Sequence, residues 1–110
     1  MRLINSNGNQ EIVKEIHKAD TITKKINGLI GKNNPQALYL ETRWGIHTFG
    51  VKFPLDIIIL DSKWRVKKIH ESLKPMKIFF WNPIYFRVLE LPQDTLKNSK
   101  VSLDDVLIIQ

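Results

Sequence analysis

The feature that most constrains the fold is a short apolar segment, Leu55–Leu60, in which Asp56 is the one polar residue. An apolar run of this length is typical of a β-strand that is buried on both faces. The turn-forming residues 61–63 follow it, and Trp64–Ile69 then has the pattern of a partner strand. The two segments together predict a β-hairpin near the middle of the chain.

Other short apolar segments alternate with turn residues. Asn7-Gly8 lies between Arg2–Ile4 and Gln10–Ile16 and predicts a first hairpin, because both residues tolerate positive φ. Further strands are predicted from four segments by their apolar residues and bounding turns. These segments are Ala37–Glu41, Ile46–Val51, Phe86–Leu91 and Val106–Ile109.

One helix is predicted near residues 20–30, where Ile22, Ile26 and Leu29 have helical spacing, and a short second one at Gln93–Asn98. Many strands and few helices indicate a mainly β class, or β-rich α+β. We expect residues 1–110 to form one domain, since repeats and low-complexity linkers are absent. The expected architecture is a small, partly open barrel or a curled antiparallel or mixed sheet with one helix.

Composition excludes several classes of protein. The 110 residues include no cysteine, which rules out a disulfide scaffold, a Cys-ligated zinc site and a thiol nucleophile. The apolar run Ile57–Leu60 is far shorter than the roughly 20 residues of a membrane-spanning helix. Met1–Ile4 is followed by Asn5–Asn9, which is polar and turn-like rather than typical of the apolar region of a signal peptide, so the expected location is the cytoplasm, with no membrane partner.

Several blocks of the sequence resemble a known family. The blocks are Gly28-Leu29-Ile30-Gly31, Ile46-His47-Thr48-Phe49, Phe53-Pro54-Leu55-Asp56, Val66-Lys67-Lys68-Ile69, Lys74-Pro75 and Val88-Leu89-Glu90-Leu91-Pro92. In this order, over about residues 19–109, they resemble the domain-of-unknown-function family 192, DUF192. The resemblance implies a β-rich, partly barrel-like fold and implies no established reaction.

The chain departs from the family pattern at three turns or strand ends. It has Gly50-Val51 after the Ile-His-Thr-Phe block, where the family usually has a bulky apolar residue and Met. It also has Gln93-Asp94 in place of Ala-Gly, and Leu103-Asp104 in place of Gly-Asp. Because the small residues that favour tight turns are missing there, we expect those turns to be built differently.

Four polar residues form the candidate ligand site. His47 lies in an apolar strand, and a histidine can act as an acid, a base or a ligand near neutral pH. Asp56 opens the next predicted strand and could orient the His47 imidazole by a hydrogen bond. Thr48 is adjacent, and Arg43 could bind an anion. Three of them also have a purely structural interpretation: His47 as a hydrogen-bonded core histidine, Asp56 as a carboxylate that caps backbone amides, and Arg43 as a surface charge.

No metal or cofactor is expected. His17, His47 and His70 do not have metal-ligand spacing, and Gly28-Leu29-Ile30-Gly31-Lys32 is too short for a phosphate-binding loop. No residues assemble a nucleophile, a base and an oxyanion site. Glu90 alternates with two leucines and is interpreted as a solvated or cross-strand paired charge.

The net charge of +6 is concentrated in one segment. Residues 61–87 contain 7 basic and 2 acidic side chains, together with six of the ten aromatic residues. The basic candidates for nucleic-acid binding are Lys63, Arg65, Lys67, Lys68, Lys74 and Lys77. Basic residues interleaved with aromatic ones are typical of single-strand binding, although Phe79-Phe80-Trp81 is also compatible with a packed corner or a protein contact patch.

Three functions therefore stay open. The first is binding of a small polar or anionic ligand, or of a partner segment, in a cleft near His47 and Asp56. The second is nucleic-acid binding through residues 61–87. The third is an enzyme in which His47 is the general base and Asp56 orients it, although the sequence offers no substrate.

Overall fold

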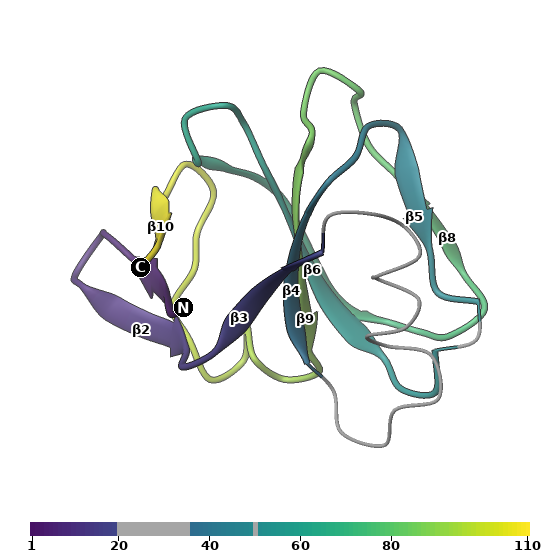
Figure 1. The fold of residues 1–110 in the computed structure, drawn as a ribbon, viewed down its shortest axis with the longest axis horizontal. Coiled ribbons are helices and arrows are strands. Elements are labelled where there is room, and N and C mark those ends of the chain that lie inside the picture. The colour runs from purple at the N-terminus through teal and green to yellow at the C-terminus, as the bar shows by residue number, and fades with distance from the viewer. Residues whose placement is uncertain (20–35, 50) are drawn as a thin grey trace.

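The computed structural model describes residues 1–19, 36–49 and 51–110, which form ten β-strands in three sheets (Figure 1). The strands are β1 (Leu3–Asn5), β2 (Gln10–Val13), β3 (Ile16–Ala19), β4 (Ala37–Glu41), β5 (Gly45–His47), β6 (Leu55–Leu60), β7 (Val66–Leu73), β8 (Ile78–Phe80), β9 (Arg87–Pro92) and β10 (Leu107–Ile109). These described residues contain no helix, so the mainly β class predicted from the sequence is confirmed.

A five-stranded mixed sheet forms the middle layer, in the order β3-β4-β9-β6-β7. Its pairs are antiparallel except β3 with β4, which are parallel. All six residues of β6 are buried, as the apolar run predicts, because β9 and β7 flank the strand and both faces of the sheet are covered. Alternate β6 side chains therefore enter different cores: Ile57 and Ile59 one, Ile58 and Leu60 the other.

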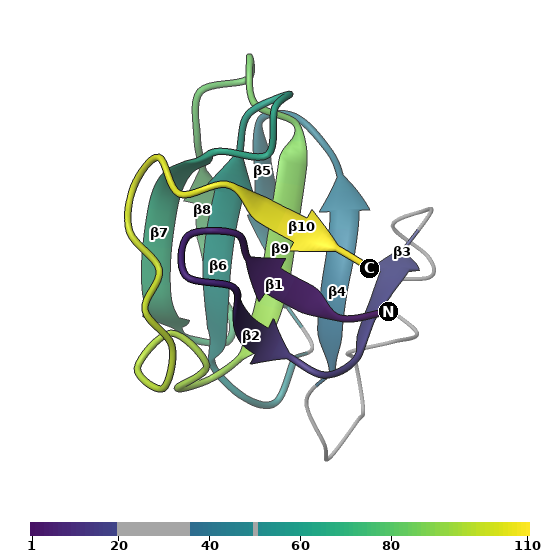
Figure 2. The same ribbon diagram turned by 90° about the vertical axis from the view of Figure 1, so that its left-hand side faces the viewer.

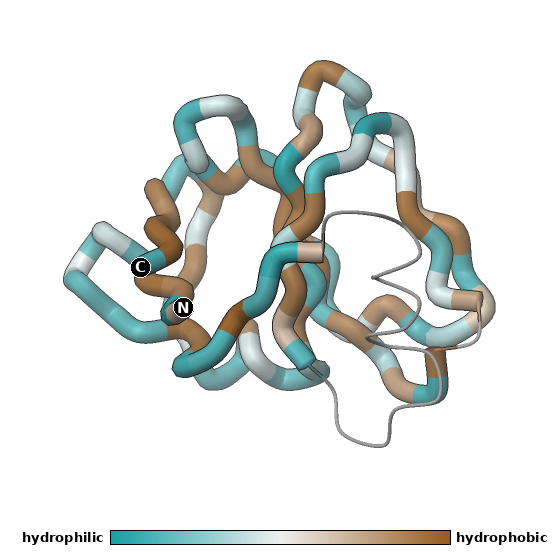
Figure 3. Tube along the Cα trace, in the orientation of Figure 1, coloured by the Kyte–Doolittle hydropathy of each residue, from teal (hydrophilic) through white to brown (hydrophobic). Residues whose placement is uncertain are grey.

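Two smaller sheets cover the two faces of the middle sheet. The sheet β10-β1-β2 lies on one side, and the two-stranded sheet β5-β8 lies on the other (Figures 1 and 2). Leu3 and Leu107 pack in the core with Ile58, whereas Ile46 and Phe79 pack in the core with Ile57. In Figure 3 the strands at the centre of the domain accordingly carry hydrophobic segments, coloured brown. All three sheets have open strand orders, so the described residues form stacked layers and not a closed barrel.

Three details differ from the sequence prediction or lie beyond it. The helix predicted near residues 20–30 lies outside the described residues. The helix predicted at Gln93–Asn98 is wrong, because these residues form turns and Asp94 has a φ of 70°, which a right-handed helix does not allow. The predicted strand Gln10–Ile16 divides into β2 and β3, which belong to different sheets. No helix among the described residues could cross a membrane.

Candidate functional site

The two-stranded β5-β8 sheet has one buried and one outward face. Its register pairs Gly45 with Phe80, Ile46 with Phe79, and His47 with Ile78. Ile46 and Phe79 are buried against the middle sheet. Because side chains alternate along a strand, the other two pairs lie on the outer face.

A shallow groove of about 340 Å³ crosses this outer side. Its lining residues are Arg43, Trp44, Gly45, Ile46, His47, Phe49, Ile78 and Phe80. We refer to this set, without the buried Ile46, as the β5-β8 face. Three of its large apolar side chains are mostly exposed: Trp44 at 69%, Phe80 at 65% and Ile78 at 55%. Exposed apolar residues that gather in one place are typical of interaction sites, whereas single ones are ordinary.

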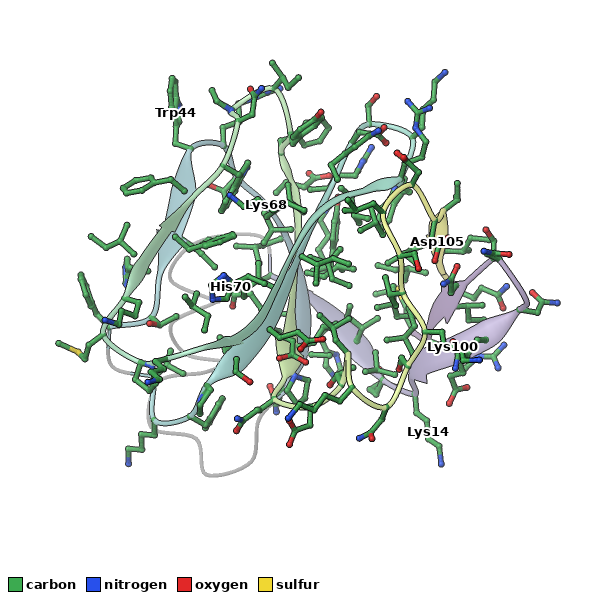
Figure 4. All side chains as sticks on the ribbon, turned by 180° about the vertical axis from the view of Figure 1, so that it is seen from behind. Lys14, Trp44, Lys68, His70, Lys100 and Asp105 are labelled. Atoms are coloured by element: carbon green, nitrogen blue, oxygen red, sulfur yellow. The ribbon has the colours of Figure 1, made fainter. Side chains whose placement is uncertain are left out.

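Trp44 has the most unusual backbone conformation on this face. Its φ is 79°, in the left-handed region that bulky residues rarely occupy, and it is the last residue of the bend before β5. Figure 4 shows the indole projecting away from the domain at the end of β5. A strained conformation of this kind costs of order 1–3 kcal/mol, and such residues cluster at functional sites.

Gly45 allows Phe80 to approach the backbone closely. A Cβ atom at Gly45 would lie 2.8 Å from the carbonyl oxygen of Phe79 and 2.8 Å from Cδ1 of Phe80. A residue with a side chain therefore does not fit here without a shift of the β8 backbone. The Phe80 ring forms part of the groove floor because its neighbour is glycine.

Arg43 supplies a fixed cation at one end of the groove. Its Nη1 atom donates to the carbonyl oxygens of Pro83, at 2.7 Å, and Ile84, at 3.4 Å. The guanidinium also lies 5.0 Å from the centre of the Phe86 ring. Because the loop at residues 82–86 holds this side chain in place, less conformational entropy is lost when the guanidinium binds an anion.

The side chains of His47 and Phe49 pack against each other on this face. Their rings are stacked, with centroids 5.0 Å apart and planes inclined by 23°. The backbone N–H of Phe49 donates to Nδ1 of His47 at 3.3 Å. Nδ1 is therefore an acceptor in this arrangement, which leaves Nε2 as the ring atom that carries the proton in the neutral form.

Thr48 is fully buried and organises the loop between β7 and β8. Its hydroxyl donates to the carbonyl oxygen of Lys74 at 2.7 Å and accepts from the N–H of Lys77 at 2.9 Å. Its own N–H donates to the carbonyl of Lys77 at 2.9 Å. The described contacts of Thr48 therefore hold residues 74–77 against the end of β5.

Asp56 is also buried, at 1% exposure, and lies in a β-bulge of the β6–β7 pair. Its two carboxylate oxygens accept the backbone N–H groups of Ser72 and Leu96, each at 2.9 Å. Leu96 belongs to the core opposite the β5-β8 layer. The structure therefore places His47 and Asp56 on different sides of the middle sheet and does not bring them together. Of the four candidate residues, Arg43 and His47 share the groove.

The six basic candidates for nucleic-acid binding do not form one continuous basic surface. Lys63 and Arg65 lie at the β6–β7 turn, Lys67 and Lys68 on β7, and Lys74 and Lys77 in the next loop. Arg65 donates to Asp61 at 2.7 Å, and Lys67 donates to Asp104 at 2.7 Å. The hydrogen bond with Asp104 raises the pKa of Lys67. Lys68 points to the other face of β7, where its Nζ lies 4.9 Å from the centre of the Phe79 ring (Figure 4).

Sequence reasoning missed several features of this region. It did not predict β8, and it left open whether Phe79-Phe80-Trp81 is core or surface. The structure divides this segment, with Phe79 and Trp81 buried and Phe80 exposed. Trp44 was not singled out, although the glycine after it is a signal of close backbone approach. Glu90 is not solvated: its exposure is 0%, on β9 between Leu38 and Ile57.

The arrangement is suited to binding. Within residues 1–19, 36–49 and 51–110, no three His, Cys, Asp or Glu side chains are placed to hold a metal ion. The groove instead combines aromatic surfaces, an aliphatic side chain, an imidazole and a held guanidinium. The fold and this face define a small, layered β domain with an exposed aromatic and cationic groove.

The chain belongs to the family DUF192, described as "Uncharacterized ACR, COG1430", whose model matches residues 3–109. This confirms the resemblance seen in the sequence. No curated protein matches the chain.

Two solved structures have a similar fold. One is a protein from Sinorhizobium meliloti described as a candidate transcription regulator, with a TM-score of 0.80 and 22% identity, over 97% of this chain and 89% of the other. The second is a protein of unknown function from Novosphingobium aromaticivorans, with a TM-score of 0.82 and 15% identity, over 99% and 84%. At these identities the likeness shows the fold alone.

Proposed function

We propose that this chain is a binding domain whose β5-β8 face holds a ligand or partner segment with an apolar body and an anionic group. The observation that carries the proposal is Trp44, which is largely exposed, has a strained backbone and lines the same groove as the held guanidinium of Arg43. A binding partner that covers the indole would recover the apolar burial that the free domain lacks.

The proposal moves the candidate site away from Asp56. The carboxylate of Asp56 is engaged by two backbone amides on the other side of the middle sheet, so it is not available to orient His47. Nδ1 of His47 accepts the amide of Phe49, and the ring stacks on the Phe49 ring. Both observations favour His47 as part of a binding surface over His47 as a general base.

The proposal can be tested with 8-anilinonaphthalene-1-sulfonate, because this dye combines fused aromatic rings with one anionic group. The dye would be titrated into the isotope-labelled protein while amide chemical shifts are recorded. We expect saturable shifts that cluster at residues 43–49 and 78–80. Arg43→Gln and Trp44→Asn should each raise the dissociation constant about tenfold, since central aromatic and arginine residues dominate binding energy.

Asparagine is chosen at position 44 because it tolerates positive φ and so preserves the local backbone. The matched controls are Arg2→Gln and Ile108→Ala, which remove an exposed cation and an exposed apolar side chain from the opposite outer sheet. Dye shifts that map elsewhere, or equal effects of control and face variants, would overturn the proposal.

A further inference from the structure

We infer that the occupant of the β5-β8 face is an acidic segment of another protein, with an apolar side chain beside Trp44 and Phe80 and a carboxylate at Arg43. This inference rests on the proposed function and names the partner of the same face. Three observations carry it: the charge of the segments that build the layer, the aliphatic residues around the groove, and the placement of the remaining lysines.

The layer that carries the face is entirely without acidic residues. Residues 42–54 and 73–86 contain Arg43, Lys52, Lys74 and Lys77, and no aspartate or glutamate. A partner of opposite charge is steered to such a surface, whereas a like-charged one is repelled. The same argument disfavours a second copy of this chain, because two identical cationic faces would meet.

The apolar residues around the groove favour a peptide over a nucleic acid. Ile78 lines the groove and is 55% exposed, and Met76 and Ile84, in the loops before and after β8, are 68% and 65% exposed. Methionine, arginine and aromatic side chains are enriched in protein interfaces. Nucleic-acid bases instead use aromatic rings for stacking, and aliphatic side chains offer them no equivalent surface.

The lysines are also placed unsuitably for a nucleic-acid strand. A single-strand site follows the phosphates over about four or more nucleotides with a continuous basic groove. Here Arg65 and Lys67 are paired with Asp61 and Asp104, away from the groove, and the Lys68 Nζ donates to the Phe80 carbonyl at 3.3 Å. The groove therefore presents one well-held cation, which suits one or two carboxylates better than a row of phosphates.

The guanidinium of Arg43 is preorganised to bind a carboxylate. The two carbonyl contacts and the Phe86 ring fix its guanidinium before a partner arrives. Both of these hydrogen bonds come from Nη1, and arginine has five N–H donors in a planar fork. Charge-assisted pairing of such a fork with a carboxylate gives strength and direction, and the short groove positions an apolar neighbour at the same time.

The test uses a short synthetic peptide in which glutamates alternate with leucine and phenylalanine. Two matched peptides replace the glutamates by glutamine or the apolar residues by alanine, and oligothymidylate is the nucleic-acid probe. Each would be titrated into the labelled protein at low salt, with chemical-shift changes reporting both affinity and location. Variants Arg43→Gln, Trp44→Asn, Arg2→Gln and Ile108→Ala complete the set, with melting temperatures recorded to verify that each is folded.

We expect the acidic, apolar peptide to bind on residues 43–49 and 78–80 at least about tenfold more tightly than either matched peptide. Arg43→Gln and Trp44→Asn should each weaken it about tenfold, while the two control variants should not. Added salt should weaken binding, because the charges lie at the rim of the groove.

Three results would overturn the inference. One is equal binding of the glutamate and glutamine peptides, and the second is tighter binding of oligothymidylate on the same residues, which would identify a nucleic-acid face. The third is no peptide binding while the dye still maps to the groove, in which case the inference fails and the proposed function stands. If the dye also fails to map there, the proposed function itself is refuted.

Discussion

Replacing Asp56 by asparagine tests whether this residue has a structural role or belongs to a ligand site. The two carboxylate oxygens accept the N–H groups of Ser72 and Leu96, each at 2.9 Å, and the side chain is 1% exposed. Asparagine keeps one acceptor oxygen and replaces the other by an NH2 group. That NH2 group cannot accept a hydrogen bond, so one backbone N–H loses its partner.

The expected cost follows from these contacts. A hydrogen bond to a charged group contributes about 1.5–3 kcal/mol, and a buried donor without a partner costs about 1–3 kcal/mol. We therefore expect Asp56→Asn to lower the free energy of unfolding by about 3 kcal/mol. With roughly 2.1 cal/mol/K per residue, 110 residues have an unfolding entropy of about 0.23 kcal/mol/K, so the melting temperature should fall by about 13 °C.

The assay is thermal and urea denaturation followed by circular dichroism. Asp94→Asn is the matched control, because Asp94 is exposed, has a weak ion pair with Lys97 at 3.7 Å, and has a φ that asparagine tolerates. The control should change the free energy of unfolding by less than about 0.5 kcal/mol. If Asp56→Asn is as mild as the control, the two amide contacts do not stabilise the fold and our interpretation is refuted.

Three more outcomes are expected. Thr48→Val should lower the free energy of unfolding by about 2 kcal/mol in urea denaturation, because the buried hydroxyl bridges Lys74 and Lys77; an unchanged midpoint would contradict this. Gly45→Ala should cost about 1–3 kcal/mol and weaken peptide binding, because its Cβ would meet the Phe79 carbonyl at 2.8 Å; unaltered β8 amide shifts would argue otherwise. Burial, followed by the hydrogen bond to Glu41, raises the pKa of Tyr39 to about 12 from 10.0, so its stabilising contribution should be complete below pH 10 and decline as the pH rises to about 12. The stability difference between the wild type and Tyr39→Phe, measured by urea denaturation across this range, should shrink, and a constant difference would disprove the assignment.

Two of the strands could be predicted with their exact bounds because local sequence and burial agree there. Ala37–Glu41 and Leu55–Leu60 are continuous segments that lie in the middle sheet, so their runs of apolar residues predict buried strands without knowledge of the strands they pair with. The three-residue strands β5 and β8 depend on each other instead. Pairing with β8 places β5 at Gly45–His47, so that only Ile46 and His47 of the predicted segment Ile46–Val51 belong to the strand. A single sequence holds little information about such a partner.

Two of the four candidate site residues could be predicted, and the other two could not, because strand pairing again depends on distant parts of the chain. Arg43 and His47 were identified from residue type, and both line the groove. The expected contact between His47 and Asp56 assumed that consecutive strands pair. In the structure β5 leaves the middle sheet and pairs with β8, while β9, from much later in the chain, takes the place beside β6. Long-range pairing of this kind separates residues that are close in sequence.

His47 and Phe49 belong both to a family block and to the β5-β8 face, but other residues of the two sets have different physical roles. Thr48 and Asp56 come from the blocks that carry the DUF192 resemblance, and their described contacts hold backbone amides and carbonyls in place. Trp44 and Phe80 lie outside those blocks, where they leave apolar surface exposed and, at Trp44, a strained φ. The conformation of Trp44 closes a tight turn, in which the N–H of Gly45 donates to the carbonyl of Arg43 at 3.0 Å, whereas the exposed indole and the Phe80 ring leave apolar surface uncovered in the free domain. The buried contacts of Thr48 and Asp56 therefore stabilise the fold, and the β5-β8 face, with its exposed apolar surface, is where a binding function is best sought.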